Sequence, residues 1–287
     1  MREGVQRVNI GMIVDRPPSP IMADVIERLA DQRVRMDVID SETALVDLKD
    51  HHLTYDWYLL KGGSPSALAL GGMLHTLGAR LMHSYPTTVI LRNKLAVMQA
   101  LVSCGVPVPE TYLVSQVESV RALLASGPVV LKPNDGRRGE GIRVVRHEAE
   151  LEGILYAAPL LVQQYCPPDG PHPEPGKTRF MKVYRIGDRI CGVWRSWPIA
   201  SWPDRDSTPC GVPDAVREIV LAVGEAFGLT LYGVDIVFSG GRPYIVDVPA
   251  MGSCTGVPDA AEYLADYFLT MGERLCASAA PGHRRVR

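Results

Sequence analysis

The sequence predicts an α/β fold, built as a small N-terminal parallel α/β domain followed by two α+β subdomains. Two observations indicate this arrangement. Short apolar strands and amphipathic helices alternate over the first 86 residues, as they do in parallel sheets covered by helices. After that point the strands come in pairs with turn residues between them, which favours antiparallel hairpins. At 287 residues the chain is long enough for two or three such units, each with its own core.

The N-terminal domain is expected over residues 1–86. Its strand candidates are the short apolar runs RVNIGMIV (7–14), MDVID (36–40) and WYLLK (57–61). The amphipathic segment MADVIERLADQ separates the first two runs, and PSALALGGMLHTLG follows the third as a helix. This order predicts a small parallel sheet with helices on both faces.

A compact central subdomain is expected over residues 87–166. It opens with TTVILRNKLAVMQALVSCG (87–105), whose pattern predicts one long helix that ends at Gly105. Strands are predicted at YLVSQ, VVLK, IRVV and LLVQQY, with helices near 116–126 and 147–156.

Hairpins dominate the expected C-terminal subdomain, residues 167–287. RFMKVYRIG turns through Asp188 into RICGVWRSW, and LTLYGVDIVFS is joined to RPYIVDV by Gly240 and Gly241. The amphipathic segment DAVREIVLAVGEAFG predicts a helix between the two hairpins. PPDGPHPEPGKT and IASWPDRDSTPCGVP are rich in turn residues and are expected to be surface loops.

Lys132 ends an apolar run in the stretch VVLKPNDGRRGEGIRVV (129–145), and a basic, glycine-rich loop follows it. The run predicts a buried strand whose last residue projects its ammonium group toward the loop. Gly136, Gly139 and Gly141, with Arg138 among them, allow backbone N–H groups to close around an anion. A phosphate is the expected ligand, and a solvated loop lysine is the alternative that this pattern alone leaves open.

Asp235 and Asp247 interrupt otherwise apolar strands, where an unpaired carboxylate would be costly. If the strands pair antiparallel through the Gly240-Gly241 turn, the two side chains face one another. Two convergent carboxylates suit Mg²⁺, which completes its shell with phosphate and water. A core aspartate bonded to backbone amides is the alternative for Asp235 alone.

Charge and cysteine content exclude several classes of protein. The net charge of −2 gives no bulk attraction to nucleic acid or to an anionic membrane, so neither is expected as a partner. The six cysteines form no CxxC pair, so a zinc site and a disulfide framework are not indicated. The apolar stretch near the N-terminus is too short for a signal peptide, and we expect a cytoplasmic protein.

Five segments carry a resemblance to a known family: LRNKLAVMQALVSCGVPVPETYLV, VVLKPNDGRRGEGIRVV, LVQQY, RFMKVYRIGDRICGVWR and LYGVDIVFSGGRPYIVDV. In this order they resemble the ATP-grasp superfamily, in the group of ribosomal-protein glutamate ligases (RimK-like) and inositol phosphate kinase-like enzymes. The resemblance implies that the two α+β subdomains clasp ATP and that ATP and Mg²⁺ are the cofactors. It also implies nucleotide-binding and metal-binding roles for specific residues.

By this resemblance, Lys94 and Lys132 would hold the α and β phosphates, and the loop 136–141 would cover them as a lid. The strand LVQQYC would bind adenine, and Asp169 would contact the ribose. Lys182 and Arg195 would be the catalytic residues near the γ-phosphate or the substrate, and Asp235 and Asp247 would bind the metal. The residues implied for nucleotide binding are Lys94, Lys132, Gly136, Arg138, Gly139, Gly141, Gln163, Gln164, Cys166 and Asp169.

The activity that the resemblance implies first is an ATP-dependent, ADP-forming carboxylate–amine ligase, which makes an amide through an acyl phosphate on a small molecule or a peptide. Small-molecule carboxylate and amine substrates would then be the partners, and a homodimer is the assembly that the resemblance allows. A small-molecule kinase with a hydroxyl acceptor, as in inositol phosphate kinases, is the alternative. Sequence alone does not separate the two activities.

One position departs from the family's pattern. The magnesium motif runs acid, any residue, asparagine, whereas this chain has Asp247, Val248 and Pro249. Proline has no side-chain oxygen for a metal. Either the metal binds more weakly, or a residue such as Ser253 supplies the oxygen, or the chain binds nucleotide without turning it over.

Overall fold

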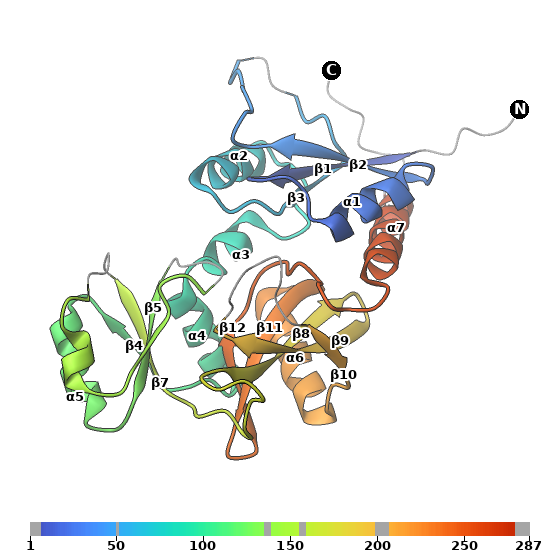
Figure 1. Ribbon diagram of the computed structural model, residues 1–287. Coiled ribbons are helices and arrows are strands. Elements are labelled where there is room, and N and C mark those ends of the chain that lie inside the picture. The colour runs from blue at the N-terminus through green and yellow to red at the C-terminus, as the bar shows by residue number, and fades with distance from the viewer. Residues whose placement is uncertain (1–6, 50–51, 135–138, 155–158, 199–206, 279–287) are drawn as a thin grey trace, which may run out of the picture. The chain divides into compact units, whose positions relative to one another are not determined.

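The computed structural model describes residues 7–49, 52–134, 139–154, 159–198 and 207–278 (Figure 1). The chain divides into two compact units, one of residues 1–88 together with 253–287, and one of residues 89–252. The predicted boundaries after residues 86 and 166 stay a prediction. The sequence pattern does not predict that the C-terminal segment returns to the first unit. No helix in the described ranges is long and apolar enough to span a membrane.

The first unit contains the predicted parallel sheet. Its strands are β1 (Val8–Val14), β2 (Val34–Asp40) and β3 (Trp57–Leu60), and β1 lies in the centre in the order β2-β1-β3. Both neighbours run parallel to β1. Every residue of β1 except Asn9 is buried, because a central strand is covered on both faces.

Three helices pack on this sheet. α1 (Pro20–Leu29) contacts β2, and α2 (Pro65–Thr76) contacts β1 and β3. The third, α7 (Ala260–Ser278), packs on α1 and β2, so the chain's last helix completes the unit that its first residues begin. Gly272 makes this approach close, because a Cβ there would lie 2.5 Å from the Val34 side chain.

The long helix predicted for residues 87–105 is wrong in one respect, because two helices occupy the segment. α3 (Tyr85–Ile90) ends before Leu91, and α4 (Lys94–Ser103) begins after a break. The Asn93 side chain accepts a hydrogen bond from the Ala96 amide (3.1 Å) and caps α4. Asparagine is favoured at the N-cap of a helix, because its short side chain can accept hydrogen bonds from the first backbone amides. Asn93 therefore separates α4 from α3.

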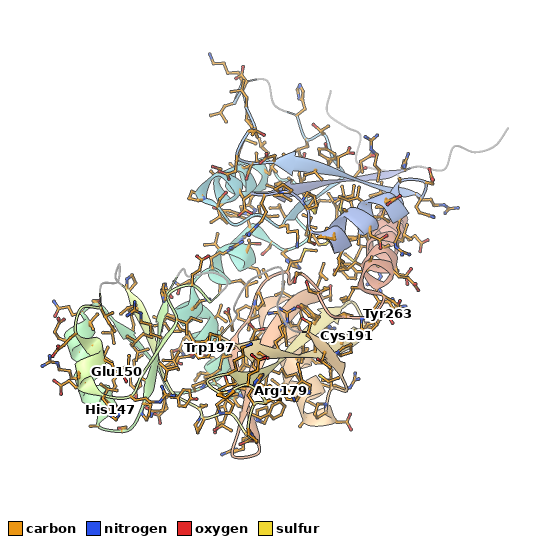
Figure 2. All side chains as sticks on the ribbon, viewed as in Figure 1. His147, Glu150, Arg179, Cys191, Trp197 and Tyr263 are labelled. Carbon is orange, nitrogen blue, oxygen red and sulfur yellow. The ribbon has the colours of Figure 1, made fainter. Side chains whose placement is uncertain are left out.

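The second unit contains two antiparallel sheets. The first has the order β4-β7-β5-β6, formed by β4 (Thr111–Val114), β7 (Leu160–Gln164), β5 (Val129–Pro133) and β6 (Arg143–Val145). α5 (Val120–Leu124) follows a one-turn helix at Val117–Ser119. In the described part of the predicted helix near 147–156, a one-turn helix forms at Glu148–Leu151. Glu150, labelled in Figure 2, accepts a hydrogen bond from the Arg146 amide at its carboxylate (2.8 Å).

The second sheet has the order β10-β9-β8-β11-β12. β8 (Thr178–Ile186) and β9 (Arg189–Trp197) form one predicted hairpin, and β11 (Leu231–Ser239) and β12 (Arg242–Asp247) form the other. The short strand β10 (Thr208–Cys210) lies in a segment that we predicted to be a loop, and α6 (Asp214–Phe227) is the predicted helix. The α/β and α+β fold class is therefore confirmed.

The core of the second unit supplies a stability prediction. Leu101 on α4 is fully buried in the cluster that α4 and α6 form with the five-stranded sheet, whereas the next residue, Val102, is 54% exposed. Leu101→Ala should lower the free energy of unfolding by about 2–5 kcal/mol, because it leaves a cavity. Val102→Ala, the matched control, should change it by about 0.5 kcal/mol or less. Chemical denaturation measures both, and equal effects would contradict this packing.

Candidate functional site

The five-stranded sheet has one apolar and one polar face, because successive side chains of a strand point to opposite sides. Met181, Val183 and Ile236 are buried in the core against α4 and α6. Lys182 lies between Met181 and Val183, and Asp235 pairs with it across the sheet, so both belong to the opposite face.

The two predicted metal ligands lie directly opposite one another on neighbouring strands. Asp235 on β11 and Asp247 at the end of β12 are register partners. The Lys182 ammonium donates a hydrogen bond to Asp235 Oδ1. The Lys94 ammonium, at the first residue of α4, lies 3.2 and 3.3 Å from the two oxygens of Asp247. Each carboxylate is therefore paired with its own lysine.

Lys132 lies at the end of β5, as predicted, and is only 6% exposed. Its ammonium donates to Gln163 Oε1 (2.6 Å) and to the carbonyl oxygen of Val246 (3.0 Å). Gln163 belongs to the same sheet and Val246 to the other, so this one group joins the two sheets of the unit. Burial lowers the pKa of Lys132 to about 8, Lys94 acts in the same direction, and Asp247 opposes them.

Three lysines and two aspartates thus form one cluster, which we call the lysine–aspartate cluster: Lys94, Lys132, Lys182, Asp235 and Asp247. Burial alone would raise the pKa of Asp247, but the three lysines outweigh it and hold that pKa below its usual value. The cluster carries one more positive than negative charge, which favours the entry of an anion.

Arg195, the second predicted catalytic residue, is 3% exposed on β9. Its guanidinium donates to the Tyr184 hydroxyl (2.8 Å), and the Lys182 ammonium lies 5.7 Å from the centre of the Tyr184 ring. Tyr184 is fully buried and was not identified from the sequence. Its place two residues after Lys182, on the same face of β8, is the signal that could have found it.

The residues predicted to bind adenine differ in their hydrogen bonds and in their burial. The Gln163 side chain accepts a hydrogen bond from Lys132 (2.6 Å) at Oε1 and donates one to Thr111 Oγ1 (3.0 Å), and a second lone pair of Oε1 can still accept an adenine amino group. Gln164 Nε2 donates to the Pro128 carbonyl (3.1 Å), and the Gln164 amide donates to the Glu110 carbonyl (2.9 Å). Cys166 is half-buried just after β7.

Asp169, the predicted ribose contact, holds a turn of the protein. Its two carboxylate oxygens accept the amides of Gly240 and Gly241 (2.7 and 2.8 Å) in the β11–β12 turn. In the predicted lid, Gly136 and Arg138 lie outside the described residues. Gly139 and Gly141 are described, and both have positive φ (78° and 71°), a conformation that glycine adopts without strain.

An apolar patch lies on the same face of the sheet as the cluster, toward the β11–β12 turn. It was not predicted from the sequence. Val237 and Tyr244 are register partners, two or three residues along their strands from Asp235 and Asp247, and Phe180 lies two residues before Lys182. All three are half-buried. Alternation along β8 and β11 places them beside the cluster, where a flat ring could pack on them.

Asn134 was also missed. Its carbonyl oxygen accepts the Lys94 amide (3.4 Å), and its side-chain oxygen accepts the Leu95 amide (3.1 Å). These bonds fix the start of α4 beside the end of β5, and so bring Lys94 and Lys132 to one place. Within the described residues, no group of three or more His, Cys, Asp or Glu side chains could hold a metal ion.

Comparison with known proteins gives distant relatives, and no protein-family model matches the chain. A probable alpha-L-glutamate ligase 2 of Shewanella amazonensis is 22% identical over 218 residues, which cover 68% of this chain and 67% of the relative. Beta-citrylglutamate synthase B of Homo sapiens is 22% identical over 179 residues, 57% of this chain and 45% of the relative. The matched segments thus cover about half to two thirds of these relatives' own lengths.

Solved structures match almost the whole chain. A RimK-domain ATP-grasp protein of Sphaerobacter thermophilus has a TM-score of 0.69 at 21% identity, covering 91% of this chain and 99% of that one. A Bacillus anthracis D-alanine–D-alanine ligase complexed with ATP has a TM-score of 0.71 at 18% identity, covering 95% and 100%. The ATP-grasp ligase PsnB, complexed with a minimal precursor, Mg and ADP, has a TM-score of 0.69 at 17% identity. The match covers 92% of this chain and 97% of that one. The chain therefore has the ATP-grasp fold, as the resemblance predicted.

The burial of Lys132 predicts a pH dependence of stability. Its pKa is about 8 in the folded protein and near 10.5 in the unfolded chain, so between these values the unfolded chain binds more protons. Stability therefore rises with pH in this window, by up to about 3 kcal/mol. In Lys132→Met this contribution is lost, while all other titrations remain. Denaturation of both proteins from pH 7 to 10.5 measures the difference, and parallel curves would contradict the lowered pKa.

Proposed function

We propose that the chain is an ATP- and Mg²⁺-dependent carboxylate–amine ligase that forms ADP. The observation that carries this proposal is the lysine–aspartate cluster, where two sheets of an ATP-grasp fold are joined by a buried lysine. The cluster offers positive charge for phosphates and carboxylates for a metal ion.

The three lysines are suited to a triphosphate. Lys94 and Lys182 are held by carboxylate oxygens, and Lys132 by an amide and a carbonyl oxygen. Phosphate oxygens accept the same hydrogen bonds and carry more charge, so they can take over these ammonium groups without leaving a donor unpaired. Lys94 and Lys132 would then hold the phosphates, and Lys182 and Arg195 would lie toward the γ-phosphate end.

Asp235 and Asp247 fit Mg²⁺. Facing carboxylates supply two hard oxygen ligands, and the ion takes the rest of its shell from phosphates and water. Bound there, Mg²⁺ would neutralise charge on the phosphoryl group in transfer. Pro249 supplies no side-chain oxygen, and its carbonyl accepts the Gly233 amide (3.0 Å), so we expect these two aspartates alone to hold the ion.

The nucleotide base would pack on the apolar patch of Phe180, Val237 and Tyr244. Base stacking on aromatic and aliphatic side chains needs no specific hydrogen bond. The segment after β7, which includes Cys166, would supply backbone groups for the base edge. The patch lies on the same face of the sheet as the cluster that would hold the phosphates and the metal ion.

The reaction would run in two steps. A substrate carboxylate oxygen attacks the γ-phosphorus, the bond from that phosphorus to the β-γ bridging oxygen breaks, and ADP leaves. An amine then attacks the acyl carbon, phosphate leaves and the amine loses a proton. The lysines disperse the charge of the transferring group, and Arg195 holds Tyr184 and the sheet face in place.

The names of the relatives support amide formation, since they include a glutamate ligase, a citrylglutamate synthase and a D-alanine–D-alanine ligase. The kinase alternative needs a basic pocket for a phosphorylated acceptor. Two arginines of the β8–β9 hairpin, Arg185 and Arg195, lie on opposite faces of the sheet, because Arg185 follows Tyr184 on β8 whereas Arg195 donates to the Tyr184 hydroxyl. The ligase is thus the better supported activity.

The reaction type can be tested directly. The protein is incubated with Mg-ATP and a pool of amino acids and organic acids, and phosphorus NMR follows the products beside a no-protein control. A ligase should release inorganic phosphate equal to the ADP formed, and omitting the amines should reduce both. A phosphate ester matching the ADP would establish the kinase instead. ATP signals that broaden without turnover would leave a nucleotide-binding protein.

The metal assignment predicts a specific loss. Asp247→Asn removes one of two carboxylates, so the Mg²⁺ concentration needed for half-maximal nucleotide binding should rise at least about tenfold. Asp259→Asn is the control, since asparagine tolerates the positive φ of 54° at that position. Titration of Mg²⁺ at fixed ATP measures both variants, and equal shifts would exclude Asp247 as a ligand.

A further inference from the structure

One edge strand of the described sheets lacks the usual protection. The edge strands of the three sheets are β2, β3, β4, β6, β10 and β12. Proteins keep such strands from pairing with other chains by making them short, by placing proline in them or by covering them. β3, β4, β6 and β10 have only three or four residues, and β12 contains Pro243. β2 has seven residues, Val34–Asp40, and no proline.

The backbone groups on the outer side of β2 come from alternate residues. The Val8 amide donates to the Arg33 carbonyl, and the Ser41 amide donates to the Val14 carbonyl (both 2.8 Å). The odd-numbered residues of this segment therefore bond to β1, and the even-numbered residues direct their N–H and C=O groups away from the sheet. In the described part of the chain these outward groups have no hydrogen-bond partner at Val34, Met36 and Val38.

The other edge of the same sheet is covered. The Tyr58 amide on β3 donates to the Arg80 carbonyl, and the Tyr58 carbonyl accepts the Met82 amide (both 2.9 Å). Leu81 thus forms a bridge with Tyr58 on the outer side of β3. The described residues place no such segment beside β2, so water or a strand of another chain must satisfy its outward groups.

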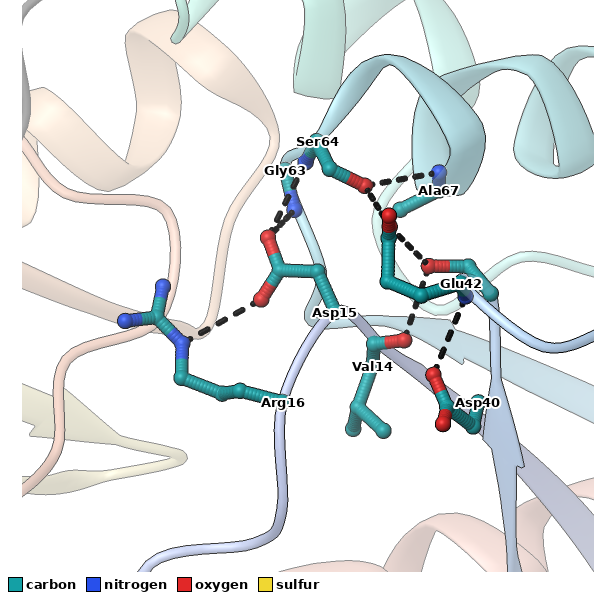
Figure 3. Close-up of polar contacts among 9 residues, drawn as sticks. Val14, Asp15, Arg16, Asp40, Glu42, Gly63, Ser64 and Ala67 are labelled. Atoms are coloured by element: carbon teal, nitrogen blue, oxygen red, sulfur yellow. Dashed lines mark hydrogen bonds and ion pairs between the residues drawn. The ribbon is translucent and has the colours of Figure 1, made fainter.

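Hydrogen bonds at the carboxyl end of the sheet hold β2 in place (Figure 3). Asp40 Oδ1 accepts the Glu42 amide (3.0 Å), and the hydroxyl of Ser64, which follows β3, donates to Glu42 Oε1. Asp15, which follows β1, accepts the Ser64 amide (3.0 Å). The edge strand is therefore ordered in advance, which lowers the entropy lost when a second strand pairs with it.

The side chains of β2 fit an antiparallel pair with a second copy of the same strand. Along Val34-Arg35-Met36-Asp37-Val38 the residues are apolar, basic, apolar, acidic and apolar. In a two-fold pair centred on Met36, Arg35 of each copy lies opposite Asp37 of the other, and Val34 lies opposite Val38. In this register Met36 exchanges both backbone hydrogen bonds with its symmetry mate, because its N–H and C=O groups point outward.

Other registers lack this match. A two-fold axis at Arg35 places two arginines opposite one another, and an axis at Asp37 places two aspartates opposite one another, which is destabilising. An axis between two residues sets outward backbone groups of one copy against inward-bonded groups of the other, so no ladder forms. Charge and backbone direction therefore select the register centred on Met36.

The side chains that this register brings together are accessible. Arg35 Nε lies 2.8 Å from Asp37 Oδ1, and the two side chains are 56% and 33% exposed. In the pair each charge would have two opposite neighbours, one in its own strand and one across the interface. Val38, which is 43% exposed, would pack beside Val34 of the second copy and lose contact with water.

We propose that two copies of this chain associate through β2, which joins their parallel sheets into one continuous sheet. The inference goes beyond the proposed function and does not depend on it, because no residue of the lysine–aspartate cluster takes part. The interface is two-fold and uses the open edge of both copies. Since the segment at Leu81 covers β3 in each copy, the assembly ends at a dimer.

Sedimentation equilibrium of the full-length protein over a range of concentrations measures the assembly. A reversible dimer is expected, whose average mass falls toward that of one chain on dilution, because one strand pair makes a small interface. A protein that stays monomeric up to its solubility limit would overturn the inference.

Charge reversal tests the register. Arg35→Glu makes both charges of the edge acidic and Asp37→Lys makes both basic, so each variant alone should raise the dissociation constant of the dimer at least about tenfold. A 1:1 mixture of the two variants should associate about as tightly as wild type, because every acidic position then meets a basic one in the other chain. Neither variant can restore the ion pair within its own strand, so this rescue arises only between chains.

Arg121→Glu is the matched control, because it reverses an exposed arginine with an ion-pair partner, Glu148 (3.0 Å), outside the first unit. It should dimerise as wild type does, and a thermal transition close to that of wild type shows that each variant is folded. If the single variants dimerise normally, if their mixture stays monomeric, or if Arg121→Glu weakens the dimer equally, pairing through β2 is excluded.

Discussion

The second unit depends on one buried ammonium group. A lysine taken out of water loses strong hydration, and the fold accepts this loss only where the ammonium finds oxygen acceptors. Lys132 finds one acceptor in each of the two sheets, Gln163 and the Val246 carbonyl. The same contacts place it beside Asp247 and Lys94, so the interaction that joins the sheets also concentrates charge between them. The charge that we propose for phosphate binding thus costs stability, as the lowered pKa of Lys132 indicates.

Much of this arrangement follows from local pattern. The strands other than β10, the two hairpins and α6 were predictable, because alternation and turn residues act over a few positions. Lys132, Asp235 and Asp247 stand out as charged residues in apolar strands, and Lys182 is implied by the resemblance; all four occur in one cluster. Their pairing partners did not stand out. Which lysine meets which aspartate depends on sheet register and on the bonds of Asn134, and these link positions about 40 to 150 residues apart.

The features that local pattern does not predict have physical causes as well. Asn93 caps α4 in the middle of an apolar helical pattern. The apolar periodicity continues across this residue, so the pattern alone does not predict that the helix is interrupted there. Asp169 holds a turn through two glycine amides, a contact that no spacing along the chain reveals. The carboxyl edge of the first sheet could not be anticipated from sequence, because Asp15, Glu42 and Ser64 come together only when three strands lie parallel.

The place of α7 has a consequence for how the chain comes off the ribosome. Residues 89–252 form a continuous unit and can fold as soon as they have emerged. The first unit cannot, since β2 and α1 lack their cover until α7 is made, and α7 begins at Ala260, about 200 residues after β3 ends at Leu60. The unit that contains β1 to β3 is therefore completed after residues 89–252, although its strands are translated before them. Until then the apolar side chain of Val34, on which Gly272 packs in the finished unit, is exposed to solvent and to other proteins.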